Sequence, residues 1–520
     1  MNRDIMLERA RSRTTAWDMV IIGGGATGVG VAVDAASRGY DVLLLEQADF
    51  GKGTSSRSTK LVHGGVRYLE QGNVSLVMEA LRERGMLRQN APHLVHDLAF
   101  IVPTYTWWES PFYGLGLKVY NLLSGKYRFG PTQTLSKAET LAYLPTIKQE
   151  GLRGGVIYHD GQFDDTRLLI HLAMTAADHG ATLLNYVRVH GLTRAADGGV
   201  TGVIATELET AAEMTIPARV VINATGPFAD GVRRLVDPKA APMIAPSQGV
   251  HLVFDRSFLP GDHAIMVPHT RDGRVLFAIP WHDHTLVGTT DTPIREVSLE
   301  PRPLAEEIAF ILETAASYLQ KPTTRADVRS VFVGIRPLAK AGDGKNTAAL
   351  SRDHTIHIDN SGLLTIAGGK WTTYRNMAED CVDHAITLGE LEERHCVTRT
   401  LRIHGYDESA ADLGSLAVYG ADAVHIQKMR AADPALRDPL HPELPYCGAE
   451  VVWAARQEMA RTVEDVLARR TRALFLHARA AIAMAPRVAE LMARELGRDA
   501  AWWTQQVQEF TELAKGYLLD

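Results

Sequence analysis

The stretch WDMVIIGGGATGVGVAVDAASRGYDVLLLE, at residues 17–46, sets the architecture of the first part of the chain. Its apolar beginning, residues 17–22, predicts a buried strand, and its apolar end, residues 41–45, predicts a second one. Between them, small residues from Val29 to Arg38 predict a helix that stops at Gly39. A strand, a helix and a strand in this order form one unit of a parallel sheet, so we predict an α/β domain.

Three glycines between the first strand and the helix, Gly23, Gly25 and Gly28, form the pattern GxGxxG, and Glu46 follows the second strand. In this context the glycines permit a tight turn, a close approach of the backbone to a pyrophosphate at the helix N-terminus, and close packing of helix on strand. Glu46 is predicted to accept hydrogen bonds from a ribose 2′-hydroxyl, and its charge disfavours a cofactor of the NADP type. The pattern predicts a dinucleotide site but does not separate FAD from NAD.

Two further turns place glycine directly after a strand-like segment. One is NATGP at residues 223–227, and the other is AGGK at residues 367–370. Glycine at a strand end lets the backbone come close to a ligand. Three such turns, far apart in the sequence, indicate a long cofactor that lies across the domain.

The segment GTSSRSTKLVHGGVRYLE, residues 53–70, is rich in hydroxyl groups and glycine and then presents His63, Arg67 and Tyr68. Hydroxyl side chains are poor core residues but good hydrogen-bond donors to phosphates. Other basic residues in strand-like or glycine-rich settings are His251, Arg336, Arg352 and Lys370. The planar fork of arginine suits phosphate. An isolated basic residue is more often a surface cation, and spacing alone does not show that these side chains converge.

Composition narrows the class of protein. A chain of 520 residues is expected to form two or three domains, and 46% hydrophobic and 22% charged residues are ordinary for a globular protein. A net charge of -6 and the absence of a basic run argue against nucleic acid as a partner. The three cysteines form no CxxC pair, so we expect no zinc ribbon and no iron–sulfur cluster. So few cysteines in a chain of this length favour a reducing compartment.

The rest of the chain shows three changes of pattern. Strand-like segments at 182–189, 200–207 and 219–223 are expected to return to the cofactor sheet. Residues 249–289 alternate short strands and turns, which predicts an antiparallel sheet. From about residue 403 the composition favours helices, with clear periodicity at 449–469 and 474–496. Asn73 is predicted to cap a helix that ends near Asn90, and residues 3–13 are read as a short lead-in helix, not a secretory signal.

No uninterrupted apolar run is long enough to span a membrane. The nearest approach is WWESPFYGLGLKVYNLL at residues 107–123, which is aromatic and carries Lys118. This composition suits an element that lies at a membrane interface. A packed loop followed by a core helix explains it equally well.

The motifs GGGATG, KLVHGGVRYLE, NATGPFAD, GTTD, GIRPL, SRDHT and GGKWTTYR, in this order, resemble those of the FAD-dependent glycerol-3-phosphate dehydrogenase family, within the D-amino-acid-oxidase-like flavoproteins. The resemblance covers nearly the whole chain. It implies an α/β FAD-binding Rossmann-like domain with an antiparallel-sheet substrate domain and a C-terminal helical domain. The implied FAD-dependent oxidoreductase region is 1–400, with FAD-binding segments at about 17–90, 150–230 and 350–385. The substrate or cap sheet is placed at about 91–149 and 240–345, and the helical domain at 401–520.

The resemblance also implies roles for individual residues. The FAD-binding residues would be Gly23, Gly25, Ala26, Thr27, Gly28, Glu46, Thr54, Ser55, Ser56, Ser58, His63, Gly64, Gly65, Gly226, Gly369, Lys370 and Thr372. The substrate-binding residues would be Arg67, Tyr68, His251, Arg336, Arg352 and Lys370. The catalytic residues would be His63, His251 and Arg336, with either histidine as the base. The linker SRSTK, residues 56–60, departs from the Ser-Ser-Lys of the family and leaves the role of Arg57 open.

The implied reaction is oxidation of sn-glycerol 3-phosphate to dihydroxyacetone phosphate by hydride transfer to FAD, followed by reoxidation by a membrane quinone. The implied location is the cytoplasmic side of the cell membrane, in peripheral contact with its inner face, and the helical cap is a candidate homodimer face. No metal is expected, because no DxDxDG calcium loop is present. The alternatives are a glycerol-3-phosphate oxidase that uses oxygen, an amino- or hydroxy-acid oxidase, and a non-catalytic flavin-binding protein. Related oxidases carry an insertion that is not seen after Gly369, which favours the dehydrogenase.

Overall fold

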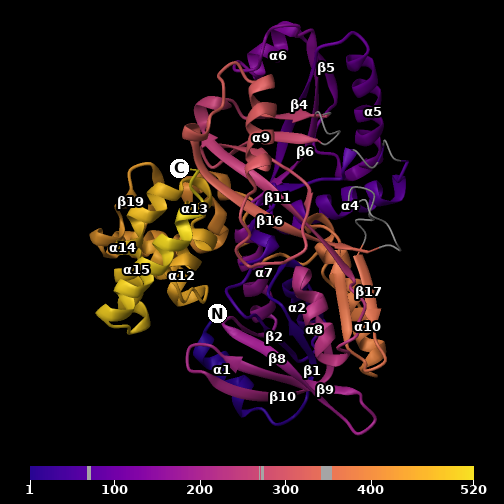
Figure 1. The fold of residues 1–520 in the computed structure, drawn as a ribbon, viewed down its shortest axis with the longest axis vertical. Coiled ribbons are helices and arrows are strands. Elements are labelled where there is room, and N and C mark those ends of the chain that lie inside the picture. Colours follow the sequence, from indigo (N-terminus) through magenta and orange to yellow (C-terminus); the bar gives the residue numbers. More distant parts are fainter. Residues whose placement is uncertain (67–68, 70–71, 269, 271–274, 341–353, 520) are drawn as a thin grey trace.

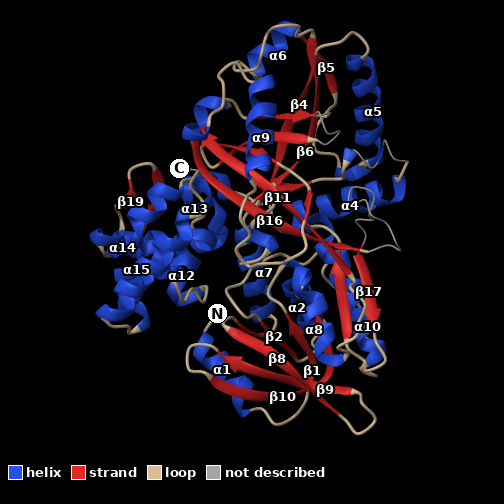
Figure 2. Ribbon diagram, viewed as in Figure 1, coloured by secondary structure: helices blue, strands red, loops and turns tan. Residues whose placement is uncertain are grey.

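The computed structural model describes residues 1–66, 69, 72–268, 270, 275–340 and 354–519. Two large sheets and a C-terminal group of helices make up the molecule (Figures 1 and 2). The first sheet forms the lower part of the view and the second the upper part, while the C-terminal helices lie beside them.

The first sheet is built around β1 (Trp17–Ile22), which pairs in parallel with β2 (Val42–Leu45) and β10 (Ala212–Asn223). Parallel pairing continues to β7 (Thr182–Leu184) on one side and to β18 (Leu364–Gly368) on the other. The edge strand β17 (His354–Ile358) is antiparallel. The strand, helix and strand predicted from residues 17–46 are therefore confirmed.

Alternate residues of β1 face two different layers. Met19 and Ile21 pack against three helices, α2 (Ala26–Ser37), α7 (Asp165–Asp178) and α10 (Tyr374–Leu388). Val20 and Ile22 pack against β8 (Val187–Arg194) and β9 (Val200–Glu207) on the opposite face, together with α1 (Arg3–Ser12). Both faces are covered, which explains why β2 and residues 19–22 of β1 are a continuous apolar run that does not alternate.

One predicted strand is broken in the structure. Residues 182–189 contain the whole of β7 and the start of β8, because the chain turns at Tyr186, which has a φ of 56°. Strands β8 and β9 form an antiparallel hairpin. Strand β9, residues 200–207, pairs antiparallel with residues 212–217, the first half of β10, and does not join the parallel strands.

The second sheet confirms the antiparallel pattern predicted for 249–289. Its central strands are β11 (Ile244–Asp255), β14 (His284–Gly288), β13 (Leu276–Trp281) and β12 (His263–Val267), with β16 (Val328–Ala339) and β15 (Thr292–Pro293) on β11. It continues through β4 (Val95–Thr104), β6 (Gly154–Phe163), β3 (Leu61–Val62) and β5 (Gln133–Ser136). The β12–β4 pair is parallel, and the other pairs are antiparallel.

Four helices accompany the second sheet: α4 (Val74–Asn90), α5 (Glu109–Leu123), α6 (Lys137–Tyr143) and α9 (Ala305–Tyr318). Helix α8 (Ala229–Val236) contacts β8, β10 and β18 of the first sheet. The predicted cap of α4 is confirmed, because the side chain of Asn73 accepts a hydrogen bond from the Leu76 amide at 3.2 Å. Among the helices of the described ranges, none is long and apolar enough to cross a membrane.

The C-terminal region contains α11 (Ala423–Ala432), α12 (Gly448–Gln457), α13 (Ala473–Leu476), α14 (Ala478–Leu496) and α15 (Ala500–Lys515), with the small hairpin β19 (Pro439–His441) and β20 (Leu444–Cys447). Residues 449–469 do not form the single helix that their periodicity predicts. The chain leaves α12 at Met459, which has a φ of 55°, and resumes in a short π-helical turn at Asp465–Arg470.

Candidate cofactor and substrate site

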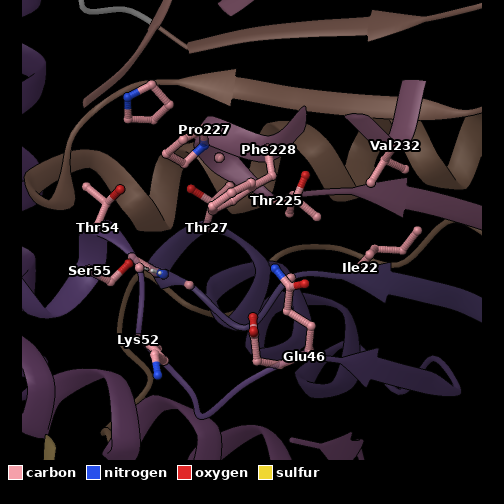
Figure 3. Close-up of a pocket in the computed structure, with 18 of the residues that line it drawn as sticks. Ile22, Thr27, Glu46, Lys52, Thr54, Ser55, Thr225, Pro227, Phe228 and Val232 are labelled. Atoms are coloured by element: carbon pink, nitrogen blue, oxygen red, sulfur yellow. Dashed lines mark hydrogen bonds between the residues drawn. The ribbon is translucent and has the colours of Figure 1, made fainter. Parts of the chain in front are cut away.

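A cavity of about 560 Å³ lies where four turns from distant parts of the sequence meet. These are the turn between β1 and α2, the loop that follows β2, the NATGP turn after β10 and the AGGK turn after β18. Figure 3 shows side chains from these turns pointing into one space, among them Thr27, Glu46, Thr54 and Thr225. The three glycine turns singled out in the sequence thus meet at one cavity.

The glycines of the first turn are fixed by backbone contacts. Gly23 has a φ of 112°, and a Cβ there would lie 2.7 Å from the Ala224 carbonyl oxygen. A Cβ on Gly28 would lie 2.0 Å from the Gly23 carbonyl oxygen, which shows how closely α2 sits on the turn. Gly25 begins α2 without a side-chain cap, so the positive end of the helix dipole faces the cavity. This arrangement suits a pyrophosphate.

Glu46 lines the cavity directly beside the glycine turn. Its carboxylate accepts hydrogen bonds from the Gly24 amide at 2.6 Å and the Ala48 amide at 2.8 Å. Burial raises the pKa of Glu46, and the two amide hydrogen bonds offset part of that rise. The side chain is therefore held in place as an acceptor at the end of β2, where the sequence predicts the ribose contact.

The four predicted hydroxyl residues divide into two pairs. Thr54 and Ser55 line the cavity, and Ser55 Oγ accepts a hydrogen bond from the Ala26 amide at 2.9 Å. Ser56 and Ser58 are not among the residues that line it. Ser58 Oγ instead donates to Asp165 at 2.7 Å, and the Ser56 carbonyl accepts from Lys60 Nζ at 2.7 Å.

A buried ion pair beneath this loop was not predicted. Lys60 Nζ lies 2.8 and 2.9 Å from the two carboxylate oxygens of Asp165, and both side chains are fully buried. The rings of Trp281, Phe332 and Phe475 surround the ammonium group. Burial lowers the pKa of Lys60, and the carboxylate of Asp165 opposes that effect. Lys60 therefore anchors the loop from below and does not face the cavity.

The segment after the AGGK turn joins the cofactor loop to the predicted substrate loop. Gly226, Gly369 and Lys370 line the cavity. Trp371 Nε1 donates to the Ser55 carbonyl at 2.9 Å, and Thr372 Oγ1 accepts from the His63 amide at 3.2 Å.

The two residues after His63 are Gly64, which is bonded by a tyrosine of helix α5, and Gly65. The Gly64 amide donates to the Tyr120 hydroxyl at 2.7 Å. Gly65 has a φ of 81°, a conformation that favours glycine. Arg67, Tyr68 and Arg352 lie outside the described residues.

His251 is buried on β11, and 2% of its surface is exposed. Its Nε2 lies 2.9 Å from Thr59 Oγ1, and its ring stacks on Phe332 with a centroid separation of 4.9 Å. A Cβ on Gly288 would lie 2.3 Å from the ring, so the glycine of GTTD makes room for it. Burial, followed by the positive charges of Arg336 and Lys60, lowers the pKa of His251 well below its usual value. The imidazole is therefore neutral at neutral pH.

Arg336 lies half-buried on β16, which pairs with β11. Its guanidinium is 3.3 Å from both the Asp291 carboxylate and the Thr289 hydroxyl, the fourth and second residues of GTTD. His63, His251 and Arg336 are not among the residues that line the 560 Å³ cavity, but Pro337 is. The predicted catalytic residues thus lie next to the cofactor cavity without forming its wall.

Lys52 lines the cavity, although no motif in the sequence singled it out. Its ammonium is 2.7 Å from Glu464, which belongs to the C-terminal region. Arg57 is buried and pairs with Glu300 at 2.7 Å, so its role is to hold this loop.

The C-terminal region also forms ion pairs with the chain just before Lys52. Asp49 is fully buried and accepts hydrogen bonds from Arg469 at 2.6 Å and Arg470 at 2.8 Å. Burial alone would raise the pKa of Asp49, but the two guanidinium groups outweigh it and lower the pKa. The loop that lines the cavity is therefore tied at several points to residues more than 200 positions away.

Two protein families match the chain. The family described as FAD dependent oxidoreductase matches residues 18–375, and the C-terminal domain of alpha-glycerophosphate oxidase matches residues 364–502. A probable mitochondrial glycerol-3-phosphate dehydrogenase from Caenorhabditis elegans is 41% identical over 529 residues, covering 96% of this chain and 73% of the relative. The mitochondrial glycerol-3-phosphate dehydrogenase of Homo sapiens is 40% identical over 539 residues, with 97% and 73% covered.

Solved structures of flavin enzymes have the same fold as this chain. The glycerol-3-phosphate dehydrogenase from Bacillus halodurans complexed with FAD superposes with a TM-score of 0.80 at 30% identity, covering 99% of this chain and 97% of the other. Glycine oxidase from Geobacillus kaustophilus, at 20% identity and a TM-score of 0.53, shares the fold.

The glycine turns, the helix N-terminus and the acid at the end of β2 fit a dinucleotide, and together with the family match they define an FAD-dependent oxidoreductase. Within that class, the chain belongs to the FAD-dependent glycerol-3-phosphate dehydrogenase family.

Proposed function

We propose that this enzyme oxidises sn-glycerol 3-phosphate to dihydroxyacetone phosphate and passes the electrons to a quinone in the membrane. The observation that carries the proposal is the place of Lys370. This cation lines the FAD cavity, and two residues further on Thr372 bonds the backbone of His63 in the predicted substrate loop. The names of the relatives identify glycerol 3-phosphate as the substrate to test.

In this proposal, Arg336 and Lys370 bind the phosphate. A guanidinium and an ammonium are complementary to a phosphate monoester. Asp291 and Thr289 fix the direction of the Arg336 guanidinium. Binding the phosphate at a fixed place positions the alcohol carbon, which is the contribution of orientation to the rate. Arg67, Tyr68 and Arg352 remain predicted members of the same phosphate site.

A histidine then accepts the proton of the alcohol, and His63 and His251 are the two candidates. His251 is neutral because its pKa is lowered, so it is able to accept a proton at neutral pH. Thr59 and Phe332 hold its ring in one orientation. Bound FAD supplies the acceptor for the hydride that leaves carbon 2.

Substrate specificity tests this proposal with a soluble dye as electron acceptor. Glycerol 3-phosphate should support turnover, whereas glycerol should not, because it lacks the phosphate. Arg336→Gln and Lys370→Gln should each raise KM for glycerol 3-phosphate by roughly 10- to 100-fold, the loss expected for one charge-assisted hydrogen bond. Arg456→Gln removes an exposed arginine that pairs with Glu495 and should leave KM unchanged. Equal turnover of glycerol and glycerol 3-phosphate would refute the substrate assignment.

Oxygen is the second candidate electron acceptor. It is favoured by the match of residues 364–502 to a domain named for alpha-glycerophosphate oxidase. The dehydrogenase names of the full-length relatives favour a quinone instead. Because a quinone is dissolved in the bilayer, we propose peripheral contact of the enzyme with the inner face of the cell membrane. Steady-state rates with a ubiquinone analogue under nitrogen and with oxygen alone distinguish the two acceptors.

A further inference from the structure

The imidazole of His251 is enclosed between two neighbouring strands of the second sheet. Phe332 of β16 stacks on the ring with 15° between the two planes. On the β14 side, a Cβ added to Gly288 would lie 2.3 Å from Cδ2 of the imidazole. Nδ1 is buried and has no hydrogen-bond partner within the described part of the chain, whereas Nε2 lies 2.9 Å from the Thr59 hydroxyl. A substrate alcohol is therefore expected to reach this ring through Thr59.

Thr59 lies between two residues that are both anchored to Asp165. Ser58 Oγ donates to this carboxylate at 2.7 Å, and Lys60 Nζ pairs with it at 2.8 Å. The Lys60 amide also donates to Ser58 Oγ at 3.0 Å, which closes the turn around Thr59. Thr59 itself is partly exposed. Because a hydroxyl can donate one hydrogen bond while it accepts another, this threonine is able to contact His251 and a bound alcohol at the same time.

His251 and Arg336 belong to the same face of the paired strands β11 and β16. Ser247 of β11 lies opposite Arg336 in the register, and residues 247, 249 and 251 alternate along β11, so they share that face. A Cβ on Gly249 would lie 2.5 Å from Nη2 of Arg336, so the guanidinium lies over this glycine, two positions from His251. Two positions along a strand span about 7 Å. A phosphate held by Arg336 therefore places the alcohol of a small substrate beside Thr59.

We propose that Thr59 is a catalytic residue, which passes the proton of the substrate alcohol to His251. The inference rests on the proposed function and selects His251 from its two candidate bases. As the hydride leaves carbon 2 for FAD with the two electrons of the C–H bond, the alcohol proton moves to Thr59 Oγ1. The proton that Thr59 carried moves to Nε2 of His251. The O–H bond of the alcohol breaks and a C=O bond forms, while Thr59 stays a neutral hydroxyl and His251 becomes an imidazolium.

Binding of the substrate phosphate favours this proton transfer. Burial, then the charges of Arg336 and Lys60, lowers the pKa of His251, so the ring begins the step neutral. Nε2 accepts the hydrogen of the Thr59 hydroxyl, and Nδ1 carries the ring hydrogen. Asp165 already pairs with Lys60, and a bound phosphate offsets the charge of Arg336. The imidazolium is therefore less disfavoured once the phosphate site is occupied.

Stopped-flow measurement of flavin reduction tests the proposal, with the full chain loaded with FAD and mixed anaerobically with glycerol 3-phosphate. Thr59→Val removes the hydroxyl at nearly constant size and should slow reduction roughly 100-fold or more, whereas Thr59→Ser keeps the hydroxyl and should stay within about tenfold of wild type. The described residues that line the FAD cavity do not include Thr59, so both variants should bind FAD like the wild type. The matched control is Thr314→Val, which removes a hydroxyl on α9 that bonds the Phe310 carbonyl and should leave the rate unchanged.

Two further measurements separate a relay from a structural role. Thr59→Val combined with His251→Asn should be slower than Thr59→Val alone by no more than about threefold, because residues that act as one unit are not additive. The wild-type rate of flavin reduction, measured in mixtures of H2O and D2O, should fall along a curve as the deuterium fraction rises, because two protons move in the same step.

Reduction of the Thr59→Val flavin at the wild-type rate overturns the relay and leaves His63 as the base. A double variant whose loss equals the product of the two single losses also overturns it, because the two residues would then act separately. So does a straight-line dependence on the deuterium fraction, a result that needs only the wild-type protein. A wild-type flavin that glycerol 3-phosphate does not bleach refutes the proposed function itself, whereas equal bleaching of wild type and Thr59→Val refutes the relay alone.

Discussion

Replacing Gly28 with alanine perturbs the contact that places α2 against the cofactor turn. The new Cβ would lie 2.0 Å from the Gly23 carbonyl oxygen, whereas ordinary contacts begin at 3.4 Å. Helix and turn would have to separate by about 1.4 Å, and overpacking of this kind costs roughly 1–3 kcal/mol. The same movement shifts the amide groups at the start of α2 away from the cofactor phosphates. We expect the dissociation constant of FAD to rise roughly 10- to 100-fold, which corresponds to about 1.4–2.8 kcal/mol.

Flavin fluorescence during titration of the apoprotein measures that constant. The matched control is Gly231→Ala, which makes the same change in helix α8, also at the cavity wall, where a Cβ would meet nothing within 4 Å. Because alanine favours a helix over glycine, the control should be as stable as the wild type or slightly more stable. If Gly28→Ala binds FAD with wild-type affinity, the packing of α2 on the turn does not govern cofactor binding.

Three further substitutions test other contacts in the structure. Glu464→Gln removes the partner of Lys52 in the cavity wall, so FAD should bind roughly tenfold more weakly, and equal retention of flavin after gel filtration would contradict this. Tyr120→Phe leaves the Gly64 amide without its acceptor and should raise KM for glycerol 3-phosphate more than it lowers kcat, as steady-state kinetics would show. Burial lowers the pKa of His404, but the hydrogen bonds that its ring donates to Asp178 and Asp422 outweigh burial and raise the pKa to about 9. The stabilisation that protonated His404 gives the folded state is therefore fully present below about pH 6.5 and is lost as pH rises through 9. The difference in unfolding free energy between wild type and His404→Asn should shrink by about 2 kcal/mol over this range, after allowance for the partial exposure of the side chain. Denaturant titrations at pH 6 and pH 10 measure that difference, and a constant gap would contradict it.

The sequence predicted the cofactor half of the site because its signals are local. The glycine turn, the helix after it and Glu46 all lie within residues 17–46, and the contact of Gly28 with Gly23 and the hydrogen bond from Gly24 to Glu46 also fall within this stretch. The same is true of Asn73, whose side chain caps the helix that starts at the next residue.

The supporting ion pairs could not be predicted, because their partners are far apart in the chain. Lys60 and Asp165 are 105 positions apart, and Lys52 and Glu464 are 412 positions apart. A single charged residue in a sequence looks like a surface residue, and only the fold shows that Lys60 is fully buried. Ser58 was predicted to face the phosphates of the cofactor, and nothing local in the sequence reveals that its hydroxyl donates to Asp165, 107 positions away.

Two elements were misjudged because backbone turns interrupted a regular pattern. Residues 182–189 have the composition of one strand, but Tyr186 adopts a left-handed conformation and divides β7 from β8. Met459 does the same at the end of α12. The aromatic segment at 107–123 contains a helix whose inner side is core, as one of its two interpretations expected, and whose outer side is exposed; its contact with a membrane stays a prediction.

Anaerobic mixing of the FAD-loaded enzyme with glycerol 3-phosphate shows, through the flavin absorbance, whether this substrate reduces the bound cofactor. We expect the oxidised flavin band to bleach with glycerol 3-phosphate but not with glycerol. A ubiquinone analogue added afterwards should restore the band quickly, and oxygen should restore it slowly. A band that persists with glycerol 3-phosphate would contradict the assigned reaction, and fast reoxidation by oxygen with peroxide formation would make the protein an oxidase.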